Sequence, residues 1–197
     1  MARRSLGGHD GFQYAFTMNE DSDETLMLAY AQGDAAAFES LYGRYRQSLY
    51  GYFLRHVSDE PTANDLYQGC WEKVIRARRR YRPTGPFRAW LFRIAHNHAM
   101  DDFRRNTPLT GLDDANTAST QPDPADHAVT AERAARLADA VSGLPPDQRD
   151  AMLLKLEGGL DLETIARITG VGRETAKSRL RYATARLKKA LSGERTE

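Results

Sequence analysis

The sequence predicts an all-α protein made of two small helical domains joined by a flexible linker. Apolar residues recur at intervals of three and four along most of the chain, which is the spacing of one helix face. No run alternates between apolar and polar residues with period two, and β-branched residues are sparse, so strands are not expected. Residues 107–127 interrupt the helical pattern with prolines, threonines and aspartates, which favours two domains over one.

The composition shows no membrane or disulfide signal. The single cysteine, Cys70, rules out an intramolecular disulfide and gives no sign of an oxidising compartment. No apolar run approaches the roughly 20 residues that a membrane span needs, so we expect no membrane insertion. The N-terminus lacks the apolar core of a signal peptide. We therefore expect a cytoplasmic protein with a disordered tail at residues 1–22, in which Met18 is a second candidate for the start of translation.

The N-terminal domain is expected over residues 23–106. Asp34 stands directly before the first long apolar run, where its carboxylate can cap a helix. A second helix is expected around Leu66 and Trp71, and a third runs from about Phe87 to Arg105 after a break at Pro83–Pro86. The residues that share one face of the first helix are Phe38, Leu41, Tyr42, Tyr45, Leu49, Tyr52 and Phe53.

The C-terminal domain is expected over residues 128–192 and ends in two helices joined by a glycine turn. A helix over about 127–142 is followed by another that starts at Pro145–Pro146 and ends at Gly158–Gly159. Asp161 can cap the next, short helix, and Gly170-Val171-Gly172 forms the turn before a helix from Arg173. The inward face of that last helix is expected to hold Ala176, Leu180, Ala183, Leu187 and Leu191.

This pair of helices predicts a helix-turn-helix, because the second one presents polar and basic residues in its first two turns. A major groove admits such a helix, and arginine pairs bidentately with guanine there. Glu174 is suited to accept from a cytosine amine, whereas Lys177 and Arg179 are suited to phosphates. An ordinary helical hairpin with a solvated basic face is the alternative.

The stretch from Arg76 to Arg105 gathers nine arginines and five aromatic rings beside only two carboxylates, in a chain of net charge +1. A solvated amphipathic helix pair would need no such concentration of charge and rings. Unpaired nucleic-acid strands are held by cationic grooves and by rings on which bases stack. The stretch therefore predicts a site for single-stranded nucleic acid.

Motifs in both predicted domains resemble bacterial sigma factors of the extracytoplasmic-function (ECF) class in the sigma-70 family. "TAKSRL" at 175–180 resembles their region-four helix-turn-helix. "DLYQGCWEKVIRARRRY" and "PFRAWLFRIAHNHAMDDFRR" resemble region two. The resemblance runs from about Asp23 to Leu191. It implies a protein without catalysis or cofactor that binds core RNA polymerase and promoter DNA and is held by an anti-sigma factor.

The resemblance also assigns roles to residues. Core polymerase would dock on Asp65, Leu66, Tyr67, Gln68 and Trp71, with Leu66 and Trp71 as apolar anchors. Gly69 and Cys70 depart from the motif, where an acidic residue usually follows the glutamine, and glycine lowers helix stability. The minus-35 element would meet Arg173, Glu174, Thr175, Lys177, Ser178, Arg179 and Arg181.

The minus-ten element, with its melted strand, would lie on the loop from Arg82 to Phe87 and on the helix after it. Tyr81 and Phe87 are expected to line a base pocket, whereas Trp90, Phe92 and Phe103 are expected in the core. The complete minus-ten set is Arg80, Tyr81, Arg82, Phe87, Arg88, Asn97, Asp101, Arg104 and Arg105.

Two other function classes compete with this one. A dimeric helix-turn-helix regulator binding duplex DNA would explain the C-terminal domain but neither the arginine-rich stretch nor the "DLYQ" helix. An enzyme is not indicated, because no glycine-rich phosphate loop, metal-ligand spacing or nucleophile–base pair is present. His96 and His98 do not form a metal site, since positions i and i+2 diverge on a helix. We expect instead a partly buried His98 hydrogen-bonded to a neighbour, and Cys70 as a small packed residue.

Overall fold

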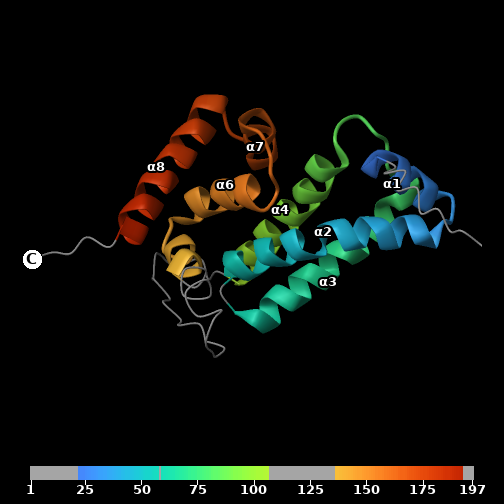
Figure 1. The fold of residues 1–197 in the computed structure, drawn as a ribbon, viewed down its shortest axis with the longest axis horizontal. Coiled ribbons are helices and arrows are strands. Elements are labelled where there is room, and N and C mark those ends of the chain that lie inside the picture. The colour runs from blue at the N-terminus through green and yellow to red at the C-terminus, as the bar shows by residue number, and fades with distance from the viewer. Residues whose placement is uncertain (1–21, 58, 107–135, 193–197) are drawn as a thin grey trace, which may run out of the picture.

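The computed structural model describes residues 22–57, 59–106 and 136–192, and every regular element in these ranges is helical (Figure 1). The all-α prediction is therefore confirmed for the described chain. The elements are α1 (Asp23–Ala31), α2 (Ala35–Val57), α3 (Glu60–Ala77), the 3₁₀ turn η1 (Arg78–Arg80), α4 (Phe87–Asn106), α6 (Pro146–Leu156), α7 (Leu162–Thr169) and α8 (Arg173–Ser192). Residues 136–142 are also helical.

The N-terminal domain is built around α2, with α1, α3 and α4 packed on it. α3 runs back along α2, and α4 crosses both (Figure 1). The predicted apolar face of α2 is buried at Leu41, Tyr45, Leu49, Tyr52 and Phe53. Tyr42 differs, since 36% of its side chain stays exposed at the edge of that face.

The predicted helix boundaries follow from local capping. Asp34 accepts hydrogen bonds from the backbone N–H groups of Ala36 and Ala37 at 2.9 and 3.3 Å. Asp161 accepts one from Thr164 at 2.7 Å, so both predicted caps are confirmed. Such caps are worth about 1 kcal/mol each. Gly170 ends α7 in the left-handed conformation, with φ of 68°, which a side chain would strain.

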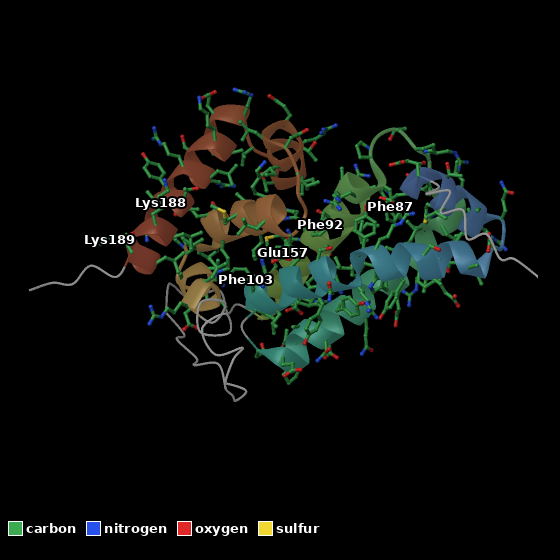
Figure 2. The ribbon with its side chains drawn as sticks, viewed as in Figure 1. Phe87, Phe92, Phe103, Glu157, Lys188 and Lys189 are labelled. Carbon is green, nitrogen blue, oxygen red and sulfur yellow. The ribbon has the colours of Figure 1, made fainter. Side chains whose placement is uncertain are left out.

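The C-terminal domain packs α6 and α7 against the long α8. The inward face of α8 is confirmed at Ala176, Ala183 and Leu187, which are buried, and Leu180 is partly buried. The prediction is wrong for Leu191, which is 44% exposed because no described element covers the last turn of α8. Figure 2 shows Lys188 and Lys189 on this same end of the helix.

The predicted tail and linker fall almost wholly outside the described residues. Ser22 is the exception, and its hydroxyl caps α1 by accepting from the N–H of Thr25 at 3.2 Å. The described parts of the two domains lie directly against each other, with α6 on α2 and α7 on α4 (Figure 1). The sequence did not predict this contact.

Candidate polymerase and nucleic-acid interfaces

The helix predicted to dock on polymerase, α3, presents a polar face to solvent. Asp65 and Gln68 are exposed, and Glu72 is exposed one turn further along the helix. The structure corrects the apolar part of the prediction, because Leu66 and Trp71 are only 3% and 5% exposed. Both side chains lie in the core and position the helix, so the groups free to meet a partner are polar.

Exposed and partly buried rings border this polar face. The Trp71 ring packs within 5.1 Å of Tyr42 and 5.6 Å of Phe38, measured between centroids. Tyr67, predicted for docking, lies partly buried against Tyr42 and Tyr50 at 6.4 and 5.7 Å. Tyr42 was missed as a surface residue, because its spacing along α2 matches that of the buried residues.

Gly69 does not interrupt α3, which is a single helix from Glu60 to Ala77. Its missing side chain makes room for His98 of α4, whose Nε2 atom lies 2.5 Å from where a Cβ atom of residue 69 would stand. The His98 ring is partly buried and packs edge-on to Phe53, with centroids 6.3 Å apart. The absence of a side chain at Gly69 therefore accommodates the His98 ring.

His98 makes no hydrogen bond through either ring nitrogen, so the hydrogen bond expected for it is wrong. The ring fills a notch beside Gly69 instead, and its partial burial is confirmed. Burial, together with the nearby charges of Lys73 and Arg105, lowers its pKa from the ordinary value, which favours a neutral ring. The buried Cys70 is a small packed residue, as predicted, and burial raises the pKa of its thiol to about 12.

We predict that Gly69→Ala destabilises the protein, although alanine is the better helix former. Overpacking costs about 1–3 kcal/mol, whereas the gain in helix propensity is about 1 kcal/mol. In a His98→Ala background the same substitution should instead raise stability by about 1 kcal/mol, because the notch is then empty. Urea unfolding of the four proteins measures both values. An equal effect in the two backgrounds would show that Gly69 and His98 are not coupled.

The predicted minus-ten loop is cationic on its surface and aromatic beneath. Arg80, Arg82 and Arg88 are exposed. The expectation that Tyr81 and Phe87 line an open base pocket is not met in this structure, because they are 3% and 0% exposed.

The rings below this loop form one packed cluster. The ring centroids of Tyr81 and Phe87 are 6.1 Å apart. The centroid of Trp90 lies 5.0 Å from that of Tyr81 and 5.6 Å from that of Phe87. The backbone N–H of Phe87 donates to Glu24 Oε1 at 2.6 Å. These contacts hold the loop onto the core, so the two rings set its position.

The rest of the predicted minus-ten set lies along α4. Asn97 and Arg88 are exposed, and the Arg88 guanidinium lies 5.4 Å from the centre of the Tyr45 ring. Arg104 pairs with Asp101 on the helix surface. Exposed pairs contribute about 0–1 kcal/mol, so phosphates can compete for these cations.

The end of α4 presents a further cation and a ring to solvent. Arg105 is exposed and lies 3.6 Å from Asp102, which is partly buried. Trp90 is partly buried and Phe92 fully buried, as predicted, but Phe103 is 51% exposed where a core position was expected. The helical spacing assigned Phe103 to the inner face, but no helix among the described residues covers this last turn.

The helix-turn-helix prediction is confirmed by α7, the Gly170 turn and α8. Arg173, Glu174, Thr175, Lys177 and Arg181 are exposed on α8, and Ser178 is partly buried. Arg173 pairs with Glu163 and with Glu174, and the Lys177 Nζ atom lies 3.6 Å from Glu174. These pairs lie on the exposed surface.

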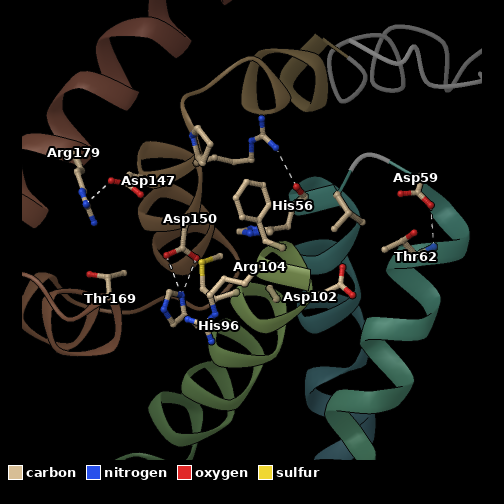
Figure 3. A pocket seen from close by; sticks show the side chains of 16 residues that line it. His56, Asp59, Thr62, His96, Asp102, Arg104, Asp147, Asp150, Thr169 and Arg179 are labelled. Carbon is tan, nitrogen blue, oxygen red and sulfur yellow. Dashed lines mark hydrogen bonds and ion pairs between the residues drawn. The ribbon is translucent and has the colours of Figure 1, made fainter. Parts of the chain in front are cut away.

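Arg179, predicted as a phosphate contact, is held within the domain in this structure. Its guanidinium is 2.5 Å from the carboxylate of Asp147 on α6. Only 23% of the Arg179 side chain is exposed, against 70% for Asp147. The pair lies at one wall of the cavity drawn in Figure 3.

A buried polar cluster joins the two domains, and sequence reasoning missed it. Asp150 of α6 is 4% exposed and accepts a hydrogen bond from the Tyr52 hydroxyl at 2.8 Å. The Nδ1 atom of His96 lies 3.0 Å from the same carboxylate (Figure 3). Burial alone would raise the pKa of Asp150, but the hydrogen bonds and charges of His96 and its neighbours hold it below the ordinary value. The chain spacing of these residues carries no signal for the cluster.

The residues that the structure describes contain no group of three or more histidine, cysteine or acidic side chains suited to a metal ion. None of the helices in those same ranges is both long enough and apolar enough to span a bilayer.

Comparisons with known proteins assign both domains to the same family. Residues 41–108 match the family model for "Sigma-70 region 2", and residues 134–187 match that for "Sigma-70, region 4". The RNA polymerase sigma factor CarQ of Myxococcus xanthus is 32% identical over 169 residues, covering 84% of this chain and 95% of CarQ. The ECF RNA polymerase sigma factor SigM of Mycobacterium tuberculosis is 30% identical over 175 residues, covering 88% of this chain and 86% of SigM.

A solved structure shows the same fold. It is that of CnrH in complex with the cytosolic domain of CnrY, and CnrH is 25% identical to this chain. The TM-score is 0.65, and the match covers 88% of this chain and 99% of CnrH.

Proposed function

The chain belongs to the ECF class of the sigma-70 family, and from that premise we propose which of its surfaces serves each step of transcription initiation. A sigma factor binds core RNA polymerase, directs it to specific promoters and helps to open them. The dimeric regulator accounts only for the helix-turn-helix, whereas both domains of this chain match sigma regions. The sigma factor is therefore the function that the findings support.

Polymerase docking is assigned to the polar face of α3. Asp65 and Gln68 are exposed on successive turns of a regular helix, so their carboxylate and amide are available to a partner. Leu66 and Trp71 act from the core by fixing the orientation of α3. The partly buried Tyr67 and the exposed edge of Tyr42 provide apolar surface beside the polar groups.

The melted minus-ten strand is assigned to the surface formed by η1, the loop after it and α4. Exposed arginines at 80, 82 and 88 neutralise its phosphates, which supply most of the affinity for single strands. Tyr81 and Phe87 support the loop from below. Asn97, Arg104 and Arg105 continue the surface along α4 toward the duplex.

The minus-35 element is assigned to the first turns of α8. Arg173 and Glu174 stand at the start of the helix, where side chains reach base edges in the major groove. Lys177 and Thr175 contact the flanking backbone, which positions the helix without reading sequence. Arg179 reaches a phosphate once it leaves Asp147.

Regulation and compartment follow from the same assignment. We infer that the chain has no catalytic activity of its own and acts in the cytoplasm, where bacterial polymerase and promoters meet. The solved relative CnrH is in complex with the cytosolic domain of CnrY, which supports an anti-sigma partner for this chain too.

The observation that carries the proposal is the presence, in one chain, of an exposed docking face on α3 and a helix-turn-helix at α7–α8. Run-off transcription with core polymerase on a library of genomic fragments tests it, with and without the protein at fixed salt. We expect discrete new transcripts that share two upstream elements. Tight binding to a palindromic duplex without any polymerase-dependent product would overturn the proposal.

A further inference from the structure

The helix α1 packs beside the loop assigned to the minus-ten strand, near the point where α4 begins. It contacts η1, which precedes that loop, and α4, which follows it (Figure 1). Residues 23–31 of α1 lie before the stretch 41–108 that matches the region-two family model. The match therefore assigns no role to α1, although α1 touches the elements on both sides of the loop.

The first turn of α4 has no capping side chain of its own. The residue before it is Pro86, whose ring carries no hydrogen-bond acceptor, and the first turn contains no acid. The free backbone N–H groups of such a turn carry partial positive charge. Glu24 of α1 supplies the missing acceptor, because its Oε1 atom accepts from the N–H of Phe87 at 2.6 Å. α4 is thus capped by a partly buried residue 63 positions away in the chain.

A second acid of α1 reaches the same place through a ring. Asp23 accepts a hydrogen bond from the hydroxyl of Tyr45, which is 2% exposed. Burial and that hydrogen bond raise the pKa of Tyr45 to about 12, so the hydroxyl keeps its proton and donates. The Arg88 guanidinium and the Phe87 ring lie 5.4 and 5.5 Å from the centre of the Tyr45 ring. Both acids of α1 therefore support the first two residues of α4.

This support matters because the loop separates two arginines assigned to the melted strand. Arg82 and Arg88 are exposed on either side of Pro83–Pro86. Arg82 is held on the η1 side, where it donates to the backbone oxygen of Tyr81 at 2.8 Å. Arg88 takes its position from α4, which Glu24 bonds to α1. Two cations bind neighbouring phosphates of one strand more tightly when the distance between them is fixed in advance.

We propose that Glu24 is a positioning residue for promoter opening, which holds the loop and Arg88, through the N–H of Phe87, at the spacing that the melted minus-ten strand requires. The inference rests on the proposed function and deepens it by adding a residue of α1 to the minus-ten surface. Glu24 acts as a hydrogen-bond acceptor, since a negative charge beside arginines by itself opposes phosphate binding. Loss of the acceptor should therefore weaken strand binding, whereas loss of the charge alone should not.

Two substitutions separate the acceptor from the charge. Glu24→Gln removes the charge and keeps an acceptor oxygen at the same reach, whereas Glu24→Asp keeps the charge and shortens the side chain by a methylene group. The probe is a single-stranded oligonucleotide with the non-template minus-ten sequence of a promoter found by run-off transcription. Fluorescence anisotropy measures its binding to holoenzyme made with each variant. We expect Glu24→Asp to weaken binding about 3- to 10-fold, as for the loss of one helix cap, and Glu24→Gln to bind at least as tightly as the wild type.

Glu39→Asp is the matched control, because it makes the same shortening at an exposed acid of α2 and should bind the strand like the wild type. Affinity for core polymerase should be equal in all these proteins, whereas a general loss of structure in Glu24→Asp would lower it together with strand binding. Unchanged strand binding by Glu24→Asp, an equal loss in Glu24→Gln, or a parallel loss of polymerase affinity would each overturn the proposal.

Hydrogen exchange of the free proteins separates this inference from the proposed function. Release of the Phe87 N–H should accelerate backbone exchange in residues 81–90 of Glu24→Asp but not of Glu24→Gln. Faster exchange in Glu24→Asp, with a wild-type holoenzyme that does not bind the minus-ten strand, would retain the cap and reject the minus-ten assignment of this surface. Strand binding by the wild type that is the same in both variants would do the reverse.

Discussion

Replacing Asp65 and Gln68 together by alanine is expected to abolish polymerase-dependent transcription. Both side chains are exposed on α3, so the helix and its core should remain intact. Polar groups at the centre of an interface cost about 2 kcal/mol or more each when truncated, which for two amounts to about 1000-fold in affinity. Run-off transcription and a direct binding assay with core polymerase measure the loss.

The matched control is the double substitution Glu39→Ala and Gln47→Ala, which removes one acid and one amide from exposed positions of α2. It should transcribe like the wild type. DNA binding by the free Asp65/Gln68 variant should also be unchanged, since the docking face is separate from both DNA surfaces. Normal transcription by that variant would show that polymerase docks elsewhere.

Arg173→Ala and Lys177→Ala are expected to weaken minus-35 recognition in two different ways. We propose that Arg173 reads a base, so its loss should cost about 1–3 kcal/mol and relax discrimination at one base pair. We propose that Lys177 contacts a phosphate, so its loss should weaken binding to all sequences alike and lower the salt dependence of binding by about one ion. Their partners Glu163 and Glu174 are exposed, which keeps competing ion pairs weak.

Binding of the holoenzyme to single-base variants of a promoter found by run-off transcription, at several salt concentrations, distinguishes the two effects. Lys188→Ala is the control, because it removes the same charge from the exposed far end of α8 (Figure 2). A uniform loss for Arg173→Ala, with no change in base preference, would assign this arginine to the backbone instead.

Sequence periodicity located the helices well but judged less well which residues of a face are covered. Phe92 and Leu187 are buried as predicted, whereas Leu191 and Phe103 are exposed although their spacing matches. Both exceptions lie in the last turns of their helices, α8 and α4. Spacing determines which face of a helix a side chain lies on, but burial also needs a neighbouring element against that face.

The candidate sites divide in the same way. The polar residues Asp65 and Lys177, assigned to docking and to DNA, are exposed in the structure. The aromatic residues Trp71, Tyr81 and Phe87, assigned to contacts by resemblance, are buried. A motif preserves core residues as well as contact residues, so it does not tell the two apart.

The sequence by itself determined the helical fold and the family, because helix periods, the Asp34 and Asp161 caps and the Gly170 turn are all local properties of the chain. Only the tertiary structure decided that Gly69 accommodates His98 and that Asp150 meets Tyr52 and His96, which lie 98 and 54 positions away from it. Such contacts depend on how whole helices pack, and the local pattern around each residue carries no record of its distant partner.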